Sequence, residues 1–167
     1  AYRVGDETIW SEWKQFTTAK IEASPFEFIW FGDAQHDVKK FVSRVFQKAF
    51  AASPDAAFWL FSGDLVDRPD YDYQIREAFD AWGFIPSVAP QVLAAGNHEY
   101  SERIVNGVKE EYLESNWKVH FTQPQNGIPS LPGTNFYVDY QGARFIILNG
   151  NEQIAEQALW LENNLNN

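Results

Sequence analysis

Residues 26–35 read FEFIWFGDAQ, which is an apolar run followed directly by a glycine and a carboxylate. The same order recurs in AAFWLFSGD at residues 56–64 and in QVLAAGNH at residues 91–98. A short apolar run that stops at a glycine predicts a buried strand with a sharp turn at its end. Three such runs in a row predict a buried sheet whose strands all end in polar residues.

The stretches between these runs predict helices. Residues 38–49 and 75–82 carry apolar side chains at spacings of three and four, which is the period of an amphipathic helix. Asp64 follows Asp33 by 31 residues and Asn97 follows Asp64 by 33, which matches the ~30 residues of a strand–helix–strand unit with parallel strands. Because the carboxyl ends of parallel strands share one edge of a sheet, we expect these three polar residues to converge.

The sequence after the third run is less regular. It predicts a helix around residues 108–117, a proline- and glycine-rich loop over residues 123–133, and a β-hairpin over residues 136–148 with Gln141-Gly142 at its turn. A final helix is expected to place apolar side chains on one face, namely Ile154, Ala158, Leu161 and Leu165.

Residues 1–22 have a different pattern, in which Trp10, Trp13 and Phe16 are spaced among polar residues without a helical period. This pattern predicts a single β-strand with aromatic packing. Because one strand cannot fold alone, we interpret it as the last strand of a preceding β-domain, with a linker near residues 23–25. Residues 23–167 then form an α/β domain that is expected to be incomplete at its C-terminus.

Composition limits the function classes. The 167 residues include 13 Lys and Arg against 23 Asp and Glu, for a net charge of −10, which disfavours nucleic acids and anionic membranes as partners. An anionic substrate then needs a local positive charge, which metal ions supply. Since the chain has no cysteine, the ligands of such ions are limited to oxygen and imidazole. No apolar run approaches the ~20 residues that span a bilayer.

The chain has no methionine and does not start with a signal peptide, so it is expected to be a processed chain or part of a longer one.

The acidic residues after the first two strands have two possible roles. Asp33 and Asp64 are metal-ligand candidates. The alternative for Asp33 is a helix N-cap, and the alternative for Asp64 is a structural turn held by an Asp67–Arg68 pair; the sequence leaves these open. Asp67 and Arg68 are candidates for supporting or substrate-binding roles. Their alternative is a structural ion pair with each other.

Asn97 and His98 offer an amide oxygen and an imidazole at one strand end, where they can bind a metal and a phosphate together. With Asp33 and the Gly-Asp-x-x-Asp motif at residues 63–67, the Gly-Asn-His-Glu motif at residues 96–99 resembles the signature of the calcineurin-like metallophosphoesterases. The resemblance covers about residues 26–165. It implies an α/β fold, the N-terminal half of a four-layer α/β/β/α sandwich, and hydrolysis of phosphate monoesters or diesters at a two-metal centre.

The resemblance also implies a role for each residue. Asp33 binds the first metal, with Gln35 at a position where many members have a metal-binding His. Asp64 bridges both metals, Asn97 binds the second, and His98 contacts the phosphate or protonates the leaving group. The metals are two manganese, zinc or iron ions, and the substrate is a phosphorylated small molecule.

Two further side chains are expected to support the site. Glu99 is suited to orienting the imidazole of His98. Arg68 is suited to holding a phosphate oxygen, as the equivalent position does in some members of the family.

The motif around residues 32–35 looks like the branch near the bacterial purple acid phosphatases, and residues 1–22 then look like the end of their fibronectin-III-like β-sandwich. That branch implies a secreted or periplasmic location. The sequence departs from it at Asp67, where the purple enzymes have Tyr.

A larger departure concerns histidine. The family's later metal-binding His and its Gly-His-x-His motif are absent, because the only histidines are His36, His98 and His120. A catalytically incomplete fragment or a noncatalytic binding module is therefore the alternative. A half-domain is also expected to expose apolar sheet surface and to self-associate. Aspartyl-phosphate phosphatases, a third class, need a second Asp two residues after the first, where this chain has Gln35.

Overall fold

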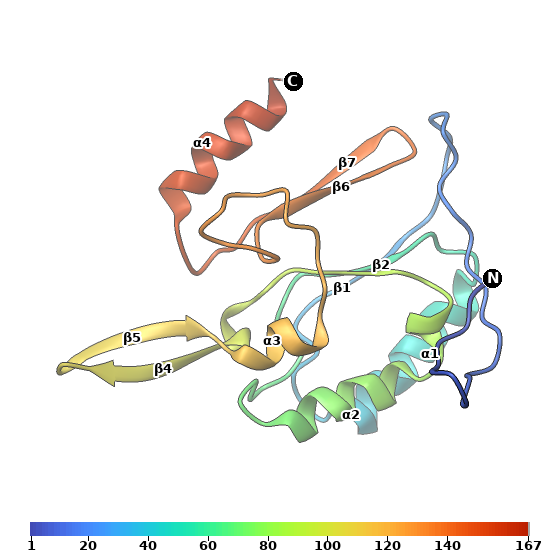
Figure 1. Cartoon of the computed structure of the whole chain (residues 1–167), viewed down its shortest axis with the longest axis horizontal. Coiled ribbons are helices and arrows are strands. Elements are labelled where there is room, and N and C mark those ends of the chain that lie inside the picture. The colour runs from blue at the N-terminus through green and yellow to red at the C-terminus, as the bar shows by residue number, and fades with distance from the viewer. Residues whose placement is uncertain (167) are drawn as a thin grey trace.

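Three short parallel strands form the centre of the computed structural model, which describes residues 1–166 (Figure 1). Strands β1 (Ile29–Phe31), β2 (Trp59–Phe61) and β3 (Gln91–Leu93) are hydrogen-bonded in that order, and both pairings are parallel. Each strand lies within one of the predicted apolar runs, so the predicted parallel sheet is confirmed.

Two helices cover one face of this sheet (Figure 1). Helix α1 (Ser43–Ala52) follows a π-helical turn, η1 (Val38–Val42), and helix α2 (Asp72–Trp82) follows β2. Both lie where helices were predicted, although the first begins with the wider turn. The core between helices and sheet is aromatic-rich, and its fully buried large side chains include Phe46, Trp59, Phe61 and Trp82.

The other face of the sheet is covered by a β-hairpin, β6 (Phe136–Tyr140) and β7 (Ala143–Ile147). Phe58, Phe136 and Ile147 are among the buried residues of this second core. The predicted Gln141-Gly142 turn is confirmed, since these residues have φ of 46° and 91°. Opposite faces of the sheet thus bury different side chains, as the alternation along a strand requires.

The predicted helix over residues 108–117 is wrong, because most of that segment is one strand of a second hairpin. Strands β4 (Tyr100–Val105) and β5 (Val108–Leu113) are antiparallel, and a short helix α3 (Ser115–His120) follows them. Figure 1 shows this hairpin projecting from the body of the protein. Its two-residue turn is Asn106-Gly107, with φ of 52° and 80°. Asn-Gly is the strongest short hairpin signal, because a type I′ turn needs positive φ at both positions.

The N-terminal segment, residues 1–22, contains no regular strand. It folds back on itself through two isolated antiparallel bridges, Tyr2 with Lys14 and Gly5 with Trp10. The guanidinium of Arg3 lies 4.3 Å from the centre of the Trp10 ring, a cation–π contact that helps to close the loop. Instead of the predicted single strand, the segment forms a loop closed by these two bridges. A preceding β-domain stays a prediction.

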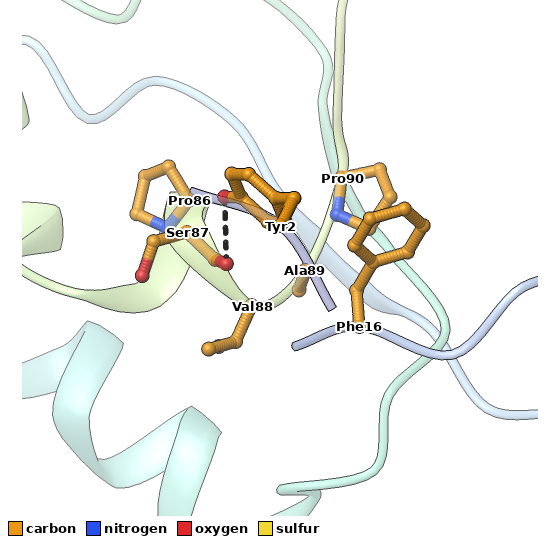
Figure 2. A pocket seen from close by; sticks show the side chains of 7 residues that line it. All are labelled: Tyr2, Phe16, Pro86, Ser87, Val88, Ala89 and Pro90. Atoms are coloured by element: carbon orange, nitrogen blue, oxygen red, sulfur yellow. Dashed lines mark hydrogen bonds between the residues drawn. The ribbon is translucent and has the colours of Figure 1, made fainter. Parts of the chain in front are cut away.

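This segment also forms one wall of a small pocket (Figure 2). Tyr2 and Phe16 face Pro86 and Pro90 across a cavity of about 210 Å³, and the hydroxyl of Tyr2 donates a hydrogen bond to the carbonyl of Ser87 at 2.9 Å. Pro90 directly precedes β3. The pocket therefore lies at the start of that strand, opposite to the end that carries the predicted site.

The last helix, α4 (Ile154–Leu165), buries a polar residue rather than its apolar stripe. Gln157 is 3% exposed, whereas Ile154 is 59% and Leu165 70% exposed. On the edge strand β1, Trp30 is 68% exposed. Among residues 1–166, no helix has both the length and the hydropathy needed to cross a membrane.

We propose that these apolar surfaces make the isolated chain self-associate, because exposed apolar patches of this kind commonly mark association surfaces. Light scattering is expected to give a mass above the 19.2 kDa of one chain. Leu159→Glu and Leu165→Glu, at two exposed positions of α4, should shift the mass towards that of a monomer. A monodisperse wild-type monomer with a cooperative melt would contradict this expectation.

Candidate functional site

The three strand ends converge, as predicted. The backbone amide of Asp33 donates a hydrogen bond to the carbonyl of Gly63 at 3.1 Å, which joins the end of the first strand to the end of the second. The backbone amide of His98 donates a hydrogen bond to Oδ1 of Asp64 at 2.9 Å, which joins the end of the second strand to the end of the third. Residues far apart in the sequence therefore meet at one edge of the sheet.

Close approach of the second and third strand ends depends on two glycines. A Cβ atom on Gly63 would lie 2.6 Å from the Cα of Gly96, and one on Gly96 would lie 2.2 Å from Oδ1 of Asp64. Both distances are too short for any real side chain. The glycines thus let the Asp64 carboxylate lie directly against the backbone at the end of the third strand.

Asp33 and Asp64 have left-handed backbone conformations, with φ of 58° and 55°. Neither caps a helix: the residue before η1 is Asp37, and the residue before α2 is Tyr71. The N-cap alternative for Asp33 is therefore excluded. Left-handed φ is uncommon for residues other than glycine and clusters at functional sites.

Gln35 lies beside the first carboxylate. Its Nε2 donates to Oδ1 of Asp33 at 2.8 Å, while its Oε1 is buried and has no hydrogen-bond partner in the described structure. A buried acceptor without a partner costs free energy. Because Nε2 faces Asp33, turning the amide would let Oε1 bind a cation beside the Asp33 carboxylate.

Glu99 organises the backbone of the site. It is 3% exposed, and its carboxylate accepts the amides of Asp64 at 2.9 Å, Leu65 at 2.9 Å and Gly96 at 2.7 Å. Burial raises the pKa of Glu99, while these three N–H groups act in the opposite direction. The expectation that Glu99 orients the imidazole is wrong, because all its hydrogen bonds within residues 1–166 go to the backbone.

The ring of His98 is instead oriented by Asp67. Nδ1 of His98 lies 3.0 Å from the carbonyl oxygen of Asp67 and 3.6 Å from its carboxylate Oδ1. A contact through Nδ1 fixes the ring plane and leaves Nε2 for a ligand or a leaving group. The loop after β2 thus positions both the Asp64 carboxylate and the imidazole.

Arg68 does not pair with Asp67. Its Nη2 and Nε lie 2.9 Å and 3.1 Å from the two oxygens of Asp70, and its guanidinium lies 4.5 Å from the centre of the Tyr71 ring. The structural pair considered from the sequence was assigned to the wrong carboxylate. The Arg68 charge is therefore already paired with the Asp70 carboxylate.

The profile of one protein family, described as calcineurin-like phosphoesterase, matches residues 26–166. The chain belongs to this family. The match includes every strand-end residue of the site and leaves residues 1–25 outside. A search of curated proteins found no matching relative. Membership in the calcineurin-like phosphoesterases implies metal-dependent hydrolysis of phosphate esters in general.

Calcineurin-like phosphoesterases typically bind two metal ions, and the donor chemistry here fits one side of such a centre. The metal ligands would be carboxylate and amide oxygens, from Asp33, Gln35, Asp64 and Asn97. Among them, Oε1 of Gln35 has no hydrogen-bond partner and so most clearly lacks another role. Within residues 1–166, however, no three His, Cys, Asp or Glu side chains come together to hold an ion. The candidate metal ligands are therefore mainly oxygen atoms, with few imidazole nitrogens.

The sequence reasoning missed two asparagines of this calcineurin-like phosphoesterase site. Nδ2 of Asn151 donates to the carbonyls of Gly96 at 3.1 Å and Ala95 at 3.4 Å, and Asn149 is fully buried next to it. A usable signal was present, because Asn149-Gly150-Asn151 follows the end of β7 just as the other motifs follow their strands.

Gly63→Ala tests the close approach of the strand ends. The new methyl group would collide with the Gly96 backbone. We expect the free energy of unfolding to fall by about 2 kcal/mol more than in a variant without this collision, which is the usual scale of overpacking. Gly107→Ala is the matched control, since Gly107 also has positive φ, 80°, but a methyl group there would meet no other atom of residues 1–166 within 4 Å. Urea unfolding measures both variants. Equal losses would contradict the close approach.

Proposed function

We propose that this chain provides part of a two-metal centre that hydrolyses phosphate esters. The observation that supports the proposal most is the convergence of Asp33, Asp64 and the Asn97-His98 turn beside an unpartnered Gln35 oxygen. Bound metal ions would supply a Lewis acid and a water of lowered pKa. The protein's own contribution is to hold ligands and substrate in place.

Each residue has a stated role in the proposal. Asp64 would be shared by the two ions, Asp33 and Gln35 would hold the first, and Asn97 would hold the second. His98 presents Nε2 to a phosphate oxygen or to the leaving group, since Nδ1 is held by Asp67. An all-oxygen set on the first ion suits a hard cation such as Mn²⁺ better than Zn²⁺.

Several finer points belong to the same proposal. The complete domain is a four-layer α/β/β/α sandwich of the purple-acid-phosphatase-like branch, acting on a phosphorylated small molecule outside the cytoplasm. Support comes from the sequence around residues 32–35 and from the tryptophans of residues 1–22. The parallel sheet with helices on one face and a hairpin on the other is compatible with part of such a sandwich.

A noncatalytic binding module is the second candidate. It is favoured by one observation: the described residues do not bring three His, Cys, Asp or Glu side chains together around an ion. The two candidates predict different chemistry from the same site. A module would bind metal or phosphate without turning over a phosphate ester.

Metal analysis combined with hydrolysis separates the candidates. The purified chain, dialysed against Mn²⁺, is expected to retain at least one ion and to hydrolyse p-nitrophenyl phosphate or its diester. His98→Ala should lower the rate by about 100-fold or more, the typical contribution of a general acid. His120→Ala is the control, because His120 lies against Asp72, with Nε2 2.9 Å from Oδ1, and should leave the rate unchanged.

Bound metal without hydrolysis would favour the module. The absence of bound metal would contradict the proposed function altogether.

A further inference from the structure

The loop after β7 reaches back to the third strand end. Asn151 lies in this loop, and its Nδ2 is 3.1 Å from the carbonyl oxygen of Gly96 and 3.4 Å from that of Ala95. These carbonyls belong to the Ala95–Gly96 and Gly96–Asn97 peptides, which directly precede Asn97 and His98. A residue more than fifty positions away in the sequence thus contacts the backbone of the proposed site.

The loop itself is rigidly held, so the position of Asn151 is well defined. The amide of Asn151 donates to Oδ1 of Asn149 at 2.9 Å. Asn149 is fully buried, and its Nδ2 donates to the hydroxyl of Tyr100 at 2.7 Å and to Oγ1 of Thr134 at 3.0 Å. The side chain of Gln157 holds the amide and carbonyl of Asn149 at 2.8 Å and 2.7 Å. A buried polar network with satisfied members fixes a single arrangement.

The Gly96 turn needs such external support. Only glycine fits there, because a Cβ atom would lie 2.2 Å from Oδ1 of Asp64. Glycine leaves its own dihedral angles unrestrained, so hydrogen bonds must set them. Glu99 holds the N–H of Gly96 at 2.7 Å, and Asn151 holds its C=O at 3.1 Å. The two side chains fix the residue from both of its peptide groups.

We propose that Asn151 is a positioning residue of the site. By holding the Gly96 carbonyl it sets the plane of the peptide between Gly96 and Asn97, and so sets where the amide of Asn97 and the ring of His98 lie relative to Asp64. The inference rests on the proposed metal centre, and it adds to that centre a residue that touches neither metal nor substrate.

Asn151→Leu tests this role, because leucine has a similar size but cannot donate a hydrogen bond. We expect Mn²⁺ to bind the variant about tenfold more weakly than the wild type, within the range that loss of an outer-shell partner produces. Isothermal titration of the full chain measures the affinity, well below the melting temperature of each variant. The absorption spectrum of bound Co²⁺ should also shift, because the ligand geometry changes.

Asn126→Leu is the matched control. Its Nδ2 donates to the carbonyl of Tyr137 at 3.1 Å and its Oδ1 accepts the amide of Tyr137 at 3.0 Å, so the variant loses similar bonds on β6. It should lose stability and keep both its Mn²⁺ affinity and its Co²⁺ spectrum. If Asn151→Leu does not fold, Asn151→Ala removes the same donor without adding apolar surface.

The outcomes separate the two proposals. A wild-type chain that binds no Mn²⁺ overturns the proposed function and this inference with it. Equal affinity and identical Co²⁺ spectra in the wild type and Asn151→Leu overturn the inference alone. Equal weakening in Asn126→Leu also overturns it, since the effect would then reflect general destabilisation.

Discussion

Changing Asp64 to asparagine is expected to weaken Mn²⁺ binding by more than about 100-fold, beyond the range produced by outer-shell partners. The physical reason is charge, because two cations a few ångströms apart need a shared anion between them. Geometry adds to the loss. Oδ1 of Asp64 accepts the amide of His98 at 2.9 Å, so the new side chain would keep that bond with its oxygen and turn its NH2 group towards the cation.

Gln35→Ala is the comparison for Asp64→Asn, measured by the same Mn²⁺ titration. Gln35 is a neutral donor on one ion only, so its loss should cost about tenfold, the lower end of the outer-shell range. Circular dichroism must show that both variants are folded. Equal losses of affinity would remove the bridging role from Asp64.

Glu99→Ala is expected to lower the free energy of unfolding by about 4 kcal/mol, because each buried donor that loses its acceptor costs about 1–3 kcal/mol. Three amides lose their acceptor at once, those of Asp64, Leu65 and Gly96. Against a total stability of about 5–15 kcal/mol for a typical protein, this loss would remove a large part of the free energy of unfolding. Urea denaturation followed by tryptophan fluorescence measures it.

Glu110→Ala is the control for Glu99→Ala. Glu110 pairs with Arg103 at 3.2 Å on the projecting hairpin, and its side chain is 44% exposed. An exposed ion pair contributes only about 0.5 kcal/mol. If both variants lost the same stability, Glu99 would not be organising the buried backbone of the site.

The sheet, the helices beside it and the edge that holds the site could all be predicted from local patterns. Apolar runs ending in glycine identified β1, β2 and β3, and Asp33, Asp64 and Asn97 followed at intervals that match strand–helix–strand units. The hairpin of β4 and β5 was missed, although its turn is Asn106-Gly107 and Asn-Gly is a strong hairpin signal. That signal was local and could have been used.

Which side chain contacts which could not be predicted in the same way. The sequence placed Glu99 near an imidazole and offered an Asp67–Arg68 pair as an alternative, and the structure shows neither contact. Neighbours in sequence are the obvious partners when only the sequence is known. In the folded chain the Glu99 carboxylate accepts hydrogen bonds from amides 34 and 35 residues away.

By itself the sequence determined the order of the strands, the family and the residue types at the site, because hydrophobic periodicity and glycine positions act over a few residues. Only the tertiary structure decided which groups support the site. Glu99 and Asn151 bind the backbone of distant segments, and the carbonyl of Asp67 contacts the ring of His98. Such contacts exist only once the strand ends meet, since their geometry depends on how the whole chain packs.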